Sequence, residues 1–261
     1  MRPPLPSPTP TWHNDTYPAI AHTRPELSMT GKTVIITGAG SGIGRATACA
    51  FAKAGASSII LIGRNESKLQ QTEQSLRGFQ AKVVLHSIDV TDEDVLILGA
   101  AFLATPAPIA DSSTEDWWQS FETNVKGTMV PAKCFLSSAG PGAAIIAVAA
   151  ATVLPPTMVP GISAYLSSKL ALTKMMEYLA AENPSLFVAT LHPGSPSGLK
   201  ISIVNLPADF TVWLASSEAS FLRGQQAWAN WDVDELKAKA QQIELGVEFT
   251  AGIYGWAFMC L

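Results

Sequence analysis

Short apolar runs alternate along the chain with longer segments whose apolar residues recur every three or four positions. Short runs bounded by glycine or polar residues predict buried strands, and the three-to-four period predicts helices. We expect strands at residues 33–37, 58–62, 83–88, 143–149, 186–191 and 226–231, and helices at residues 43–54, 66–77, 113–132, 163–181, 208–217 and 232–243. Alternation of this kind predicts one α/β domain built on a doubly wound parallel sheet.

The first 30 residues follow a different pattern. They carry prolines at positions 3, 4, 6, 8 and 10 among threonines and histidines. Proline fixes the backbone and removes a hydrogen-bond donor, so we expect residues 1–30 to form an extended Pro-rich arm without helix or core. The domain proper is then expected to span residues 31–261.

Composition limits the class of protein. Of the 261 residues, 48% are apolar and 15% are charged, which excludes a mainly disordered chain and suits strands buried on both faces. A formal net charge of −4 gives no electrostatic footprint for nucleic acid or for an anionic membrane. The three cysteines lie far apart and lack metal-ligand spacing, which favours a reducing compartment. We therefore expect a cytoplasmic protein with a small-molecule substrate, without nucleic-acid, membrane or metal partners.

A glycine-rich turn follows the first strand, with the sequence Thr37-Gly-Ala-Gly-Ser-Gly-Ile-Gly44. Glycines let the backbone approach a pyrophosphate, which the free N–H groups of the following helix can bind. This pattern predicts a Rossmann-type dinucleotide site with contacts from Gly38, Ser41, Gly42, Ile43 and Gly44. A tight turn without any ligand is the alternative.

The end of the second strand indicates which dinucleotide would bind. An acidic residue there would hold the ribose 2′-hydroxyl of NAD, but the chain has Gly63-Arg64. A guanidinium suits a 2′-phosphate, so Arg64 favours NADP over NAD. A solvated surface cation is the alternative.

Tyr165 and Lys169 lie four residues apart on a predicted helix and share one face. A nearby ammonium stabilises a phenolate, so we interpret Tyr165 as a proton donor and Lys169 as the group that tunes it. Alternatively, the lysine merely extends past a half-buried tyrosine.

Taken together, these motifs resemble those of the short-chain dehydrogenase/reductase family, and particularly members found in fungal secondary-metabolite pathways. The matching positions cover nearly the whole chain: residues 37–44, 89–90, 124–127, 160–161, 163–165, 169, 192–194 and 228–236. The resemblance implies that Asn124 holds a water in a proton relay, that Lys169 also binds the nicotinamide ribose and that Asp89 lies beside the adenine. It also implies a homodimer or homotetramer. Lys133, Pro193 and Gly194 are further cofactor-binding candidates.

The chain departs from the family pattern where side chains should carry the reaction. A serine is expected after the strand at residues 143–149, but Ala149 and Ala150 stand there. Thr152 lies thirteen residues before Tyr165, the spacing the family commonly shows, so either Thr152 replaces the serine or the hydroxyl is lost. Two amides expected at the fourth strand are also missing from Leu98-Gly-Ala-Ala101, and the loop after Gly194 lacks an expected threonine.

The connection after the third strand is unusually short. Asp89-Val-Thr91 is followed almost at once by the apolar run Val95-Leu-Ile-Leu98. Parallel strands need a connection of about a dozen or more residues, so a crossover helix is apparently missing. Either this run is not the usual fourth strand or the third strand is displaced; one interpretation makes residues 92–103 a helix and leaves the sheet a strand short.

Three functional hypotheses follow. The first is an NADP-dependent oxidoreductase that interconverts a ketone and an alcohol on a small metabolite. The second is a descendant without redox activity, either a cyclase or isomerase using Tyr165 or a binding protein, since a fold alone does not fix a function. The third is an impaired, truncated relative without a well-packed domain.

Overall fold

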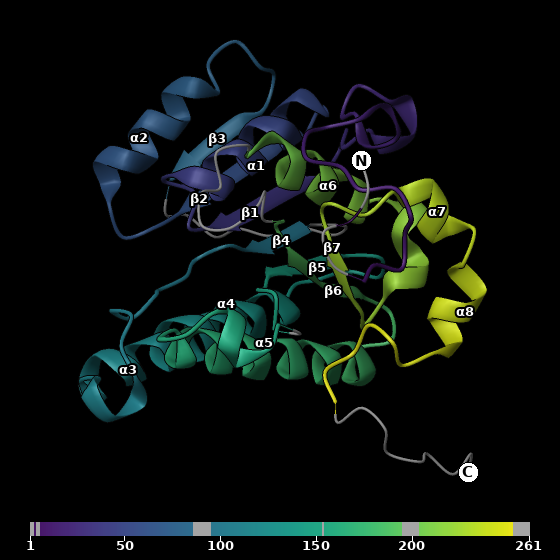
Figure 1. Ribbon diagram of the computed structural model, residues 1–261. Helices are drawn as coiled ribbons and strands as arrows, with labels where there is room; N and C mark the ends of the chain where they lie inside the picture. Colours follow the sequence, from purple (N-terminus) through teal and green to yellow (C-terminus); the bar gives the residue numbers. More distant parts are fainter. Residues whose placement is uncertain (1–2, 4–5, 86–94, 153, 195–203, 253–261) are drawn as a thin grey trace.

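A single parallel sheet organises the protein. The computed structural model describes residues 3, 6–85, 95–152, 154–194 and 204–252 (Figure 1). In this part of the chain seven strands pair in the order β3-β2-β1-β4-β5-β6-β7, and every pair is parallel. The strands are β1 Thr33–Thr37, β2 Ser58–Ile62, β3 Lys82–Leu85, β4 Val95–Leu98, β5 Ala144–Val148, β6 Phe187–His192 and β7 Gln226–Trp228. This order confirms the predicted doubly wound Rossmann-type fold.

Helices cover both faces of the sheet (Figure 1). One layer holds α1 Gly42–Lys53, α2 Glu66–Ser75 and α6 Asn205–Leu214; the other holds α3 Thr114–Phe121, α4 Gly127–Leu136 and α5 Ser163–Glu182. The chain closes with α7 Val233–Lys237 and α8 Ala240–Leu245 beside β7. Short 3₁₀ turns occupy Pro18–Ile20, Pro25–Leu27, Ile109–Asp111, Pro156–Met158 and Ser217–Leu222.

Alternate residues of each strand enter opposite layers. In β1, Val34 and Ile36 belong to the core under α1 and α6, whereas Ile35 belongs to the core under α4 and α5. All three are buried. A strand that must fill two cores reads as a continuous apolar run, which is why the sequence pattern located β1, β2 and β5 within a residue or two.

The run Val95–Leu98 is the fourth strand after all. It forms β4 between β1 and β5, so the interpretation of residues 92–103 as a helix in a six-stranded sheet is wrong. Nine residues, 86–94, separate β3 from β4 and lie outside the described residues; this is fewer than a usual crossover. From the end of β3 to the start of β4 the chain must cross three strand spacings, about 14 Å. It must also step back by two residues, about 7 Å, because Leu85 lies level with Ile97. Ten Cα steps span at most about 33–36 Å, so a connection of this length can join the two strands.

Two predicted helices are divided. The helix expected at residues 113–132 is α3, a five-residue π-helical segment Glu122–Lys126 and α4, and α4 contains Pro131. The helix expected at residues 232–243 is α7 and α8, because Lys239 leaves the helical conformation between them. The π segment brings Asn124 inward and fully buries it. Single π turns of this kind often occur at functional sites.

The amino-terminal arm contributes to the core, contrary to expectation. It contains two 3₁₀ turns and buries Trp12, Ile20 and Leu27 in the layer that holds α1 and α6. Trp12 also forms an isolated antiparallel bridge with Trp231, just after β7. Pro18 and Pro25 each start one of these turns.

Charged pairs anchor the arm to the carboxyl-terminal half. Arg24 Nη2 donates to Glu218 Oε1 at 2.6 Å, and the bond from Arg24 lowers the pKa of that carboxyl to about 2. His13 Nε2 lies 2.8 Å from Asp232 Oδ2. The division at residue 30 stays a prediction about folding units, but the turn Pro18–Ile20 of the arm contacts α6 and α7.

Candidate cofactor and active site

The glycine-rich turn lies at the carboxyl edge of the sheet, between β1 and α1. Gly38 has a φ of +73°, which side chains rarely adopt, and a Cβ on Gly44 would overlap the Gly38 carbonyl oxygen. Ser41 is the N-cap of α1, and its side chain makes no capping hydrogen bond. The first-turn N–H groups of α1 therefore remain available to an anion, so the turn fits a pyrophosphate.

The end of β4 packs directly on this turn. Thr37 Oγ1 accepts hydrogen bonds from Gly99 N at 3.1 Å and Ala100 N at 3.3 Å. A Cβ on Gly38 would come within 2.8 Å of the Gly99 backbone, so the two segments touch as bare main chain. The stretch that lacks the family's amides thus still supports the cofactor turn through Gly99. Sequence reasoning missed this role, although Gly99 directly follows four apolar strand residues.

Arg64 is exposed two residues after β2, next to the turn. The register pairs Thr37 with Ile62, so both strands end at the same level of the sheet. Asn65 caps α2 by accepting from Lys68 N at 3.0 Å, which fixes the start of this helix. Ala39 N donates to Ile62 O at 3.3 Å, so the end of β2, two residues before Arg64, lies against the glycine-rich turn. The role of Arg64 in choosing NADP stays a prediction.

Lys169 is buried in the first half of α5. Its Nζ donates to Val148 O, the last carbonyl of β5, at 2.7 Å, and the side chain is 1% exposed. Burial lowers the pKa of this amine to about 8. The Nζ lies 5.8 Å from the centre of the Tyr165 ring, so the predicted pair shares one face of the helix.

Tyr165 differs from its prediction in one respect. It is half-buried, and burial raises the pKa of its phenol, with no contribution from the ammonium to lower it. The reason is that Lys169 Nζ points to Val148 and lies beside the ring. In this arrangement the phenol of Tyr165 is neutral at physiological pH, and its role as a proton donor stays a prediction.

Asn124 is fully engaged by hydrogen bonds within the protein. Its Oδ1 accepts from Phe102 N at 2.8 Å, while its Nδ2 donates to Phe102 O and to Ser168 Oγ, both at 2.9 Å. The side chain therefore ties the segment after β4 to α5, one residue before Lys169. Its main-chain carbonyl also accepts from Thr128 Oγ1 at 2.8 Å. The water relay through Asn124 stays a prediction.

The strand end next to Lys169 offers no hydroxyl. Ala149 N continues the ladder to Leu191 O at 2.8 Å, and Ala149 and Ala150 are buried. Thr152 lines a large cavity of about 750 Å³, whereas Tyr165 lines a separate cavity of about 10 Å³. The structure therefore does not bring Thr152 and Tyr165 to one cavity.

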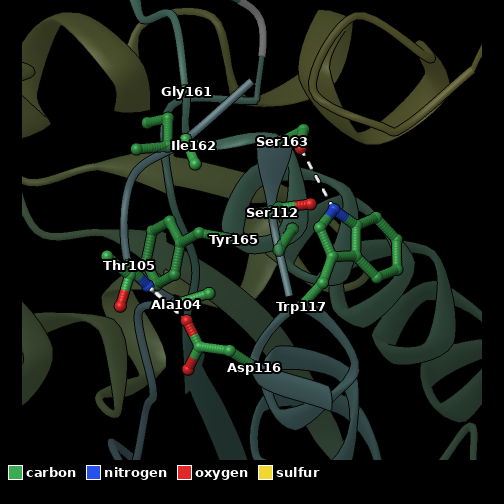
Figure 2. A pocket seen from close by; sticks show the side chains of 11 residues that line it. Ala104, Thr105, Ser112, Asp116, Trp117, Gly161, Ile162, Ser163 and Tyr165 are labelled. Carbon is green, nitrogen blue, oxygen red and sulfur yellow. Dashed lines mark hydrogen bonds between the residues drawn. The ribbon is translucent and has the colours of Figure 1, made fainter. Parts of the chain in front are cut away.

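Figure 2 shows the small cavity beside Tyr165. Asp116 accepts from Thr105 N at 2.7 Å, and Trp117 Nε1 donates to Ser163 Oγ at 3.1 Å. These bonds fix the loop after β4 and the start of α5 around the phenol. A volume of about 10 Å³ has room for about one water. The cavity can therefore hold a proton carrier at Tyr165, but not a substrate in this conformation.

Pro193 and Gly194 follow β6 at the same edge and are buried. Gly194 has a φ of +88°, and a Cβ there would approach Asn230 Oδ1 to 2.5 Å. Burial lowers the pKa of the neighbouring His192 to about 3, so this imidazole is neutral. The Pro-Gly turn therefore lies beside the ends of β5 and β7. Its contact with the cofactor stays a prediction.

Two predicted residues fall outside this constellation. Lys133 is exposed in the last turn of α4. It lies nine residues beyond Asn124, about 13 Å along a helix, so the structure does not bring it to the other predicted residues. Asp89 lies outside the described residues.

The fold and the site define a class before any comparison: a nucleotide-binding α/β protein with a tyrosine and a lysine at the carboxyl edge of its sheet. A family model for short chain dehydrogenases matches residues 32–94 and 94–195. A short chain dehydrogenase/reductase of Claviceps purpurea is 32% identical over 269 residues, covering 92% of this chain and 91% of that protein. Short chain dehydrogenase citE of Monascus ruber is 31% identical, covering 90% and 94%. The chain belongs to the short-chain dehydrogenase/reductase family.

Solved structures agree on the fold. A short chain dehydrogenase of Salmonella enterica serovar Typhi superposes with a TM-score of 0.68 at 21% identity, covering 79% of this chain and 98% of that one. A protein of Escherichia coli CFT073, solved in complex with NADPH, has a TM-score of 0.66 at 22% identity, covering 79% and 99%. Among the described residues, none of the helices combines the length and the apolar character needed to cross a membrane.

Proposed function

We propose that the protein is an NADP-dependent oxidoreductase that interconverts a ketone and an alcohol on a small metabolite, in a cytosolic step of fungal secondary-metabolite biosynthesis. One observation carries the proposal: buried Lys169 and half-buried Tyr165 lie one helical turn apart at the end of β5. The glycine-rich turn follows β1 at the same edge, and only β4 separates the two strands. Residues 31–261 are proposed as the catalytic unit.

NADP fits the residues at this edge. The N–H groups of the turn from Gly38 to Gly44 would hold the pyrophosphate, and Arg64 would pair with the 2′-phosphate. Gly194 and Lys169 would lie on the nicotinamide side. When bound, NADP supplies the hydride donor or acceptor. The E. coli protein solved with NADPH gives support at the level of the fold.

Side chains of the protein supply and position the proton that the reaction needs. Tyr165 is neutral at physiological pH because burial raises its pKa, so in the reductive direction it donates a proton to the substrate oxygen. Lys169 is held by Val148 O, and Asn124 fixes the helix that carries both groups through Ser168. Lys169 and Asn124 thus position the acid.

Stabilisation of the substrate oxygen is the weak part of the site. Ala149 and Ala150 occupy the strand end and supply no hydroxyl. Losing one donor aimed at a developing oxyanion lowers rates by about 10²–10³. The proposed reaction is therefore slow, unless the substrate contributes its own internal hydrogen bond to the reacting carbonyl.

The proposal is tested by titrating folded protein with NADPH and following energy transfer from tryptophan to the nicotinamide. We expect saturable binding that is weaker for NADH. A protein that melts cooperatively but binds neither NADPH nor NADP⁺ would exclude the redox function. The cooperative transition would also exclude the impaired, truncated relative.

The strand-end alanines specifically favour a second candidate, an isomerase or cyclase in which Tyr165 acts as an acid without hydride transfer. Such a protein would need Tyr165 but neither Arg64 nor the glycine-rich turn. Conversion of a candidate substrate that is unchanged by removing NADPH, but lost in Tyr165→Phe, would establish it. Dependence on NADPH would exclude it.

We also propose a homodimer or homotetramer through α3, α4 and α5. Large apolar side chains on this outer layer are exposed: Trp118 55%, Met129 42%, Val130 49% and Tyr178 63%. An exposed apolar face of this kind commonly marks an association surface. Sedimentation of the wild type and of Val130→Asp tests it, with the variant expected to shift toward monomer.

A further inference from the structure

A second cavity lies apart from the small cavity at Tyr165. It measures about 750 Å³ and lies between the loop after β5, the edge strand β7, the amino-terminal arm and residues 248–252. It shares no lining residue with the cavity at Tyr165. Cavities of about 300–1,000 Å³ are the size that binds organic small molecules.

Aromatic rings form one wall of this cavity. The rings of Trp228 and Trp231 are parallel within 8° at 6.1 Å, and Trp12 meets Trp228 edge-on at 6.1 Å. Phe249 lies 4.9 Å from Trp231. Four rings from three separate segments thus converge on one space without filling it. Walls of this kind favour a flat ring system, which can stack on an indole or meet its edge.

Another part of the lining is aliphatic. It contains Met158 from the loop after β5 and Leu170 from α5, whose side chains are 55% and 46% exposed. Exposed apolar side chains on two elements facing a cavity lose contact with water when a ligand enters. This burial would supply most of the affinity.

Charge restricts the ligand further. Glu248 is the one ionised side chain among the described lining residues, and no lysine or arginine lines the space. An anionic ligand such as a nucleotide would lack a counter-ion there, so the cavity is not a second cofactor site. The polar side chains on its wall include the Thr152 hydroxyl, the Thr250 hydroxyl, which donates to Val247 O at 2.7 Å, and the amide of Gln226, whose Nε2 donates to Ala150 O at 2.9 Å. They suit a hydroxyl or carbonyl at one end of the ligand.

We propose that this cavity binds a neutral, planar, multi-ring molecule carrying a hydroxyl or carbonyl group. The ligand stacks against the tryptophan wall and contacts Met158 and Leu170 on its other face. The arm completes the site through Trp12, so ligand binding and arm packing stabilise each other. This site does not depend on hydride transfer at Tyr165 and would exist in a protein without redox activity.

The test uses 1-hydroxyanthraquinone, a neutral planar three-ring phenol, and quenching of tryptophan fluorescence in the full chain. We expect saturable quenching that NADPH does not displace. Leu170→Glu and Met158→Glu should each weaken binding at least about tenfold, since each replaces an apolar contact with a charge. Leu245→Glu is the matched control: Leu245 is 80% exposed, lies outside the cavity and should leave binding unchanged.

Four results would overturn the proposal. They are absence of saturable quenching, displacement of the probe by NADPH, equal binding by the Leu170→Glu variant, and binding that appears only after residues 253–261 are deleted. The last result would show that the chain fills the cavity with its own carboxyl-terminal segment. Unchanged melting temperatures of the variants keep loss of binding separate from loss of fold.

Discussion

The two halves of the sheet's carboxyl edge differ in how closely they match the family pattern. In the cofactor half, around β1, α1 and β2, a Cβ on Gly38 or Gly44 would collide with the backbone, and the family model matches this stretch. In the chemistry half, at the ends of β4 and β5, the resemblance leads us to expect two amides and a serine, where the chain has Leu98, Gly99 and alanines. The glycines of the turn are kept because a side chain at these positions would disrupt the packing of the backbone. Side-chain chemistry can be lost without disturbing the fold.

The largest effect expected is on the remaining chemistry. Tyr165→Phe should lower turnover by about 10²–10⁴, because a positioned proton donor contributes that much, while NADPH affinity stays within about twofold. The measurement is single-turnover oxidation of NADPH in the presence of a ketone that the wild type reduces. Tyr178→Phe is the control, as Tyr178 lies on the same helix and is 63% exposed. Equal turnover of wild type and Tyr165→Phe would mean that the phenol has no part in catalysis.

The cofactor half is tested by Gly44→Ala. The added Cβ would overlap the Gly38 carbonyl oxygen, so the turn must open. We expect NADPH binding to weaken about 100-fold, since such overpacking costs about 1–3 kcal/mol and displaces the N–H groups that bind the anion. Gly127→Ala is a matched change in a helix, where the nearest atom is 3.4 Å away. If both variants bind NADPH like the wild type, the turn is not the cofactor site.

Adding a hydroxyl at the end of β5 should raise activity, whereas the two preceding substitutions lower activity or cofactor binding. Ala149→Ser or Ala150→Ser should raise kcat by about tenfold or more, because one aimed donor is worth about 10²–10³ in favourable geometry. Thr152→Ala should change kcat less than about twofold, since Thr152 faces the large cavity. A loss of 10² or more in Thr152→Ala would instead identify Thr152 as the replacement for the serine.

A smaller effect is expected at Arg64. Arg64→Ala should weaken NADPH binding about tenfold and leave NADH binding unchanged, because only NADPH carries the 2′-phosphate. The difference between the two titrations isolates the guanidinium from any general damage to the turn. Lys53→Ala, at the end of α1 away from the glycine-rich turn, provides the surface-charge control. An equal loss for both nucleotides would mean that Arg64 does not select the cofactor.

The features predicted correctly from the sequence are those that depend on residues close to one another in the chain. The strand Thr33–Thr37, the turn and the pair Tyr165 and Lys169 each depend on residues within a few positions, and all were located correctly. The place of β4 in the sheet was not, because the rule for connection length described typical crossovers and not the reach of an extended chain. Local pattern also could not reveal that Gly99 supports the cofactor turn from another strand.

The arm shows the same limit at longer range. Its composition indicated an extended segment, yet Arg24 meets Glu218 and His13 meets Asp232 about two hundred residues away. Periodicity carries no information about such partners. Likewise, the side chain of Asn124 in the π segment forms hydrogen bonds with Phe102 and Ser168, which are distant in the sequence. Tertiary contacts override local propensity in both places.

The smallest expected effect concerns stability and separates function from folding in the chemistry half. Burial lowers the folded-state pKa of Lys169 to about 8, below its ordinary value of 10.5. Between these values the unfolded chain binds more protons than the folded chain, so the free energy of unfolding rises with pH across this window. Below pH 8 the folded protein must bury a charged ammonium that has Val148 O as its partner.

Lys169→Met should therefore raise the melting temperature at pH 7 by about 2–4 °C, since about 1 kcal/mol corresponds to that shift in a domain of this size. The gain should shrink as pH rises beyond 8, while NADPH oxidation is lost at every pH. Differential scanning fluorimetry from pH 6.5 to 10 measures this, with Lys174→Met on the exposed side of α5 as control. A gain would show that Lys169 is kept at the cost of stability and hence for chemistry. A less stable variant would instead make the ammonium part of the packing, and the chemistry half would then have kept it for the fold.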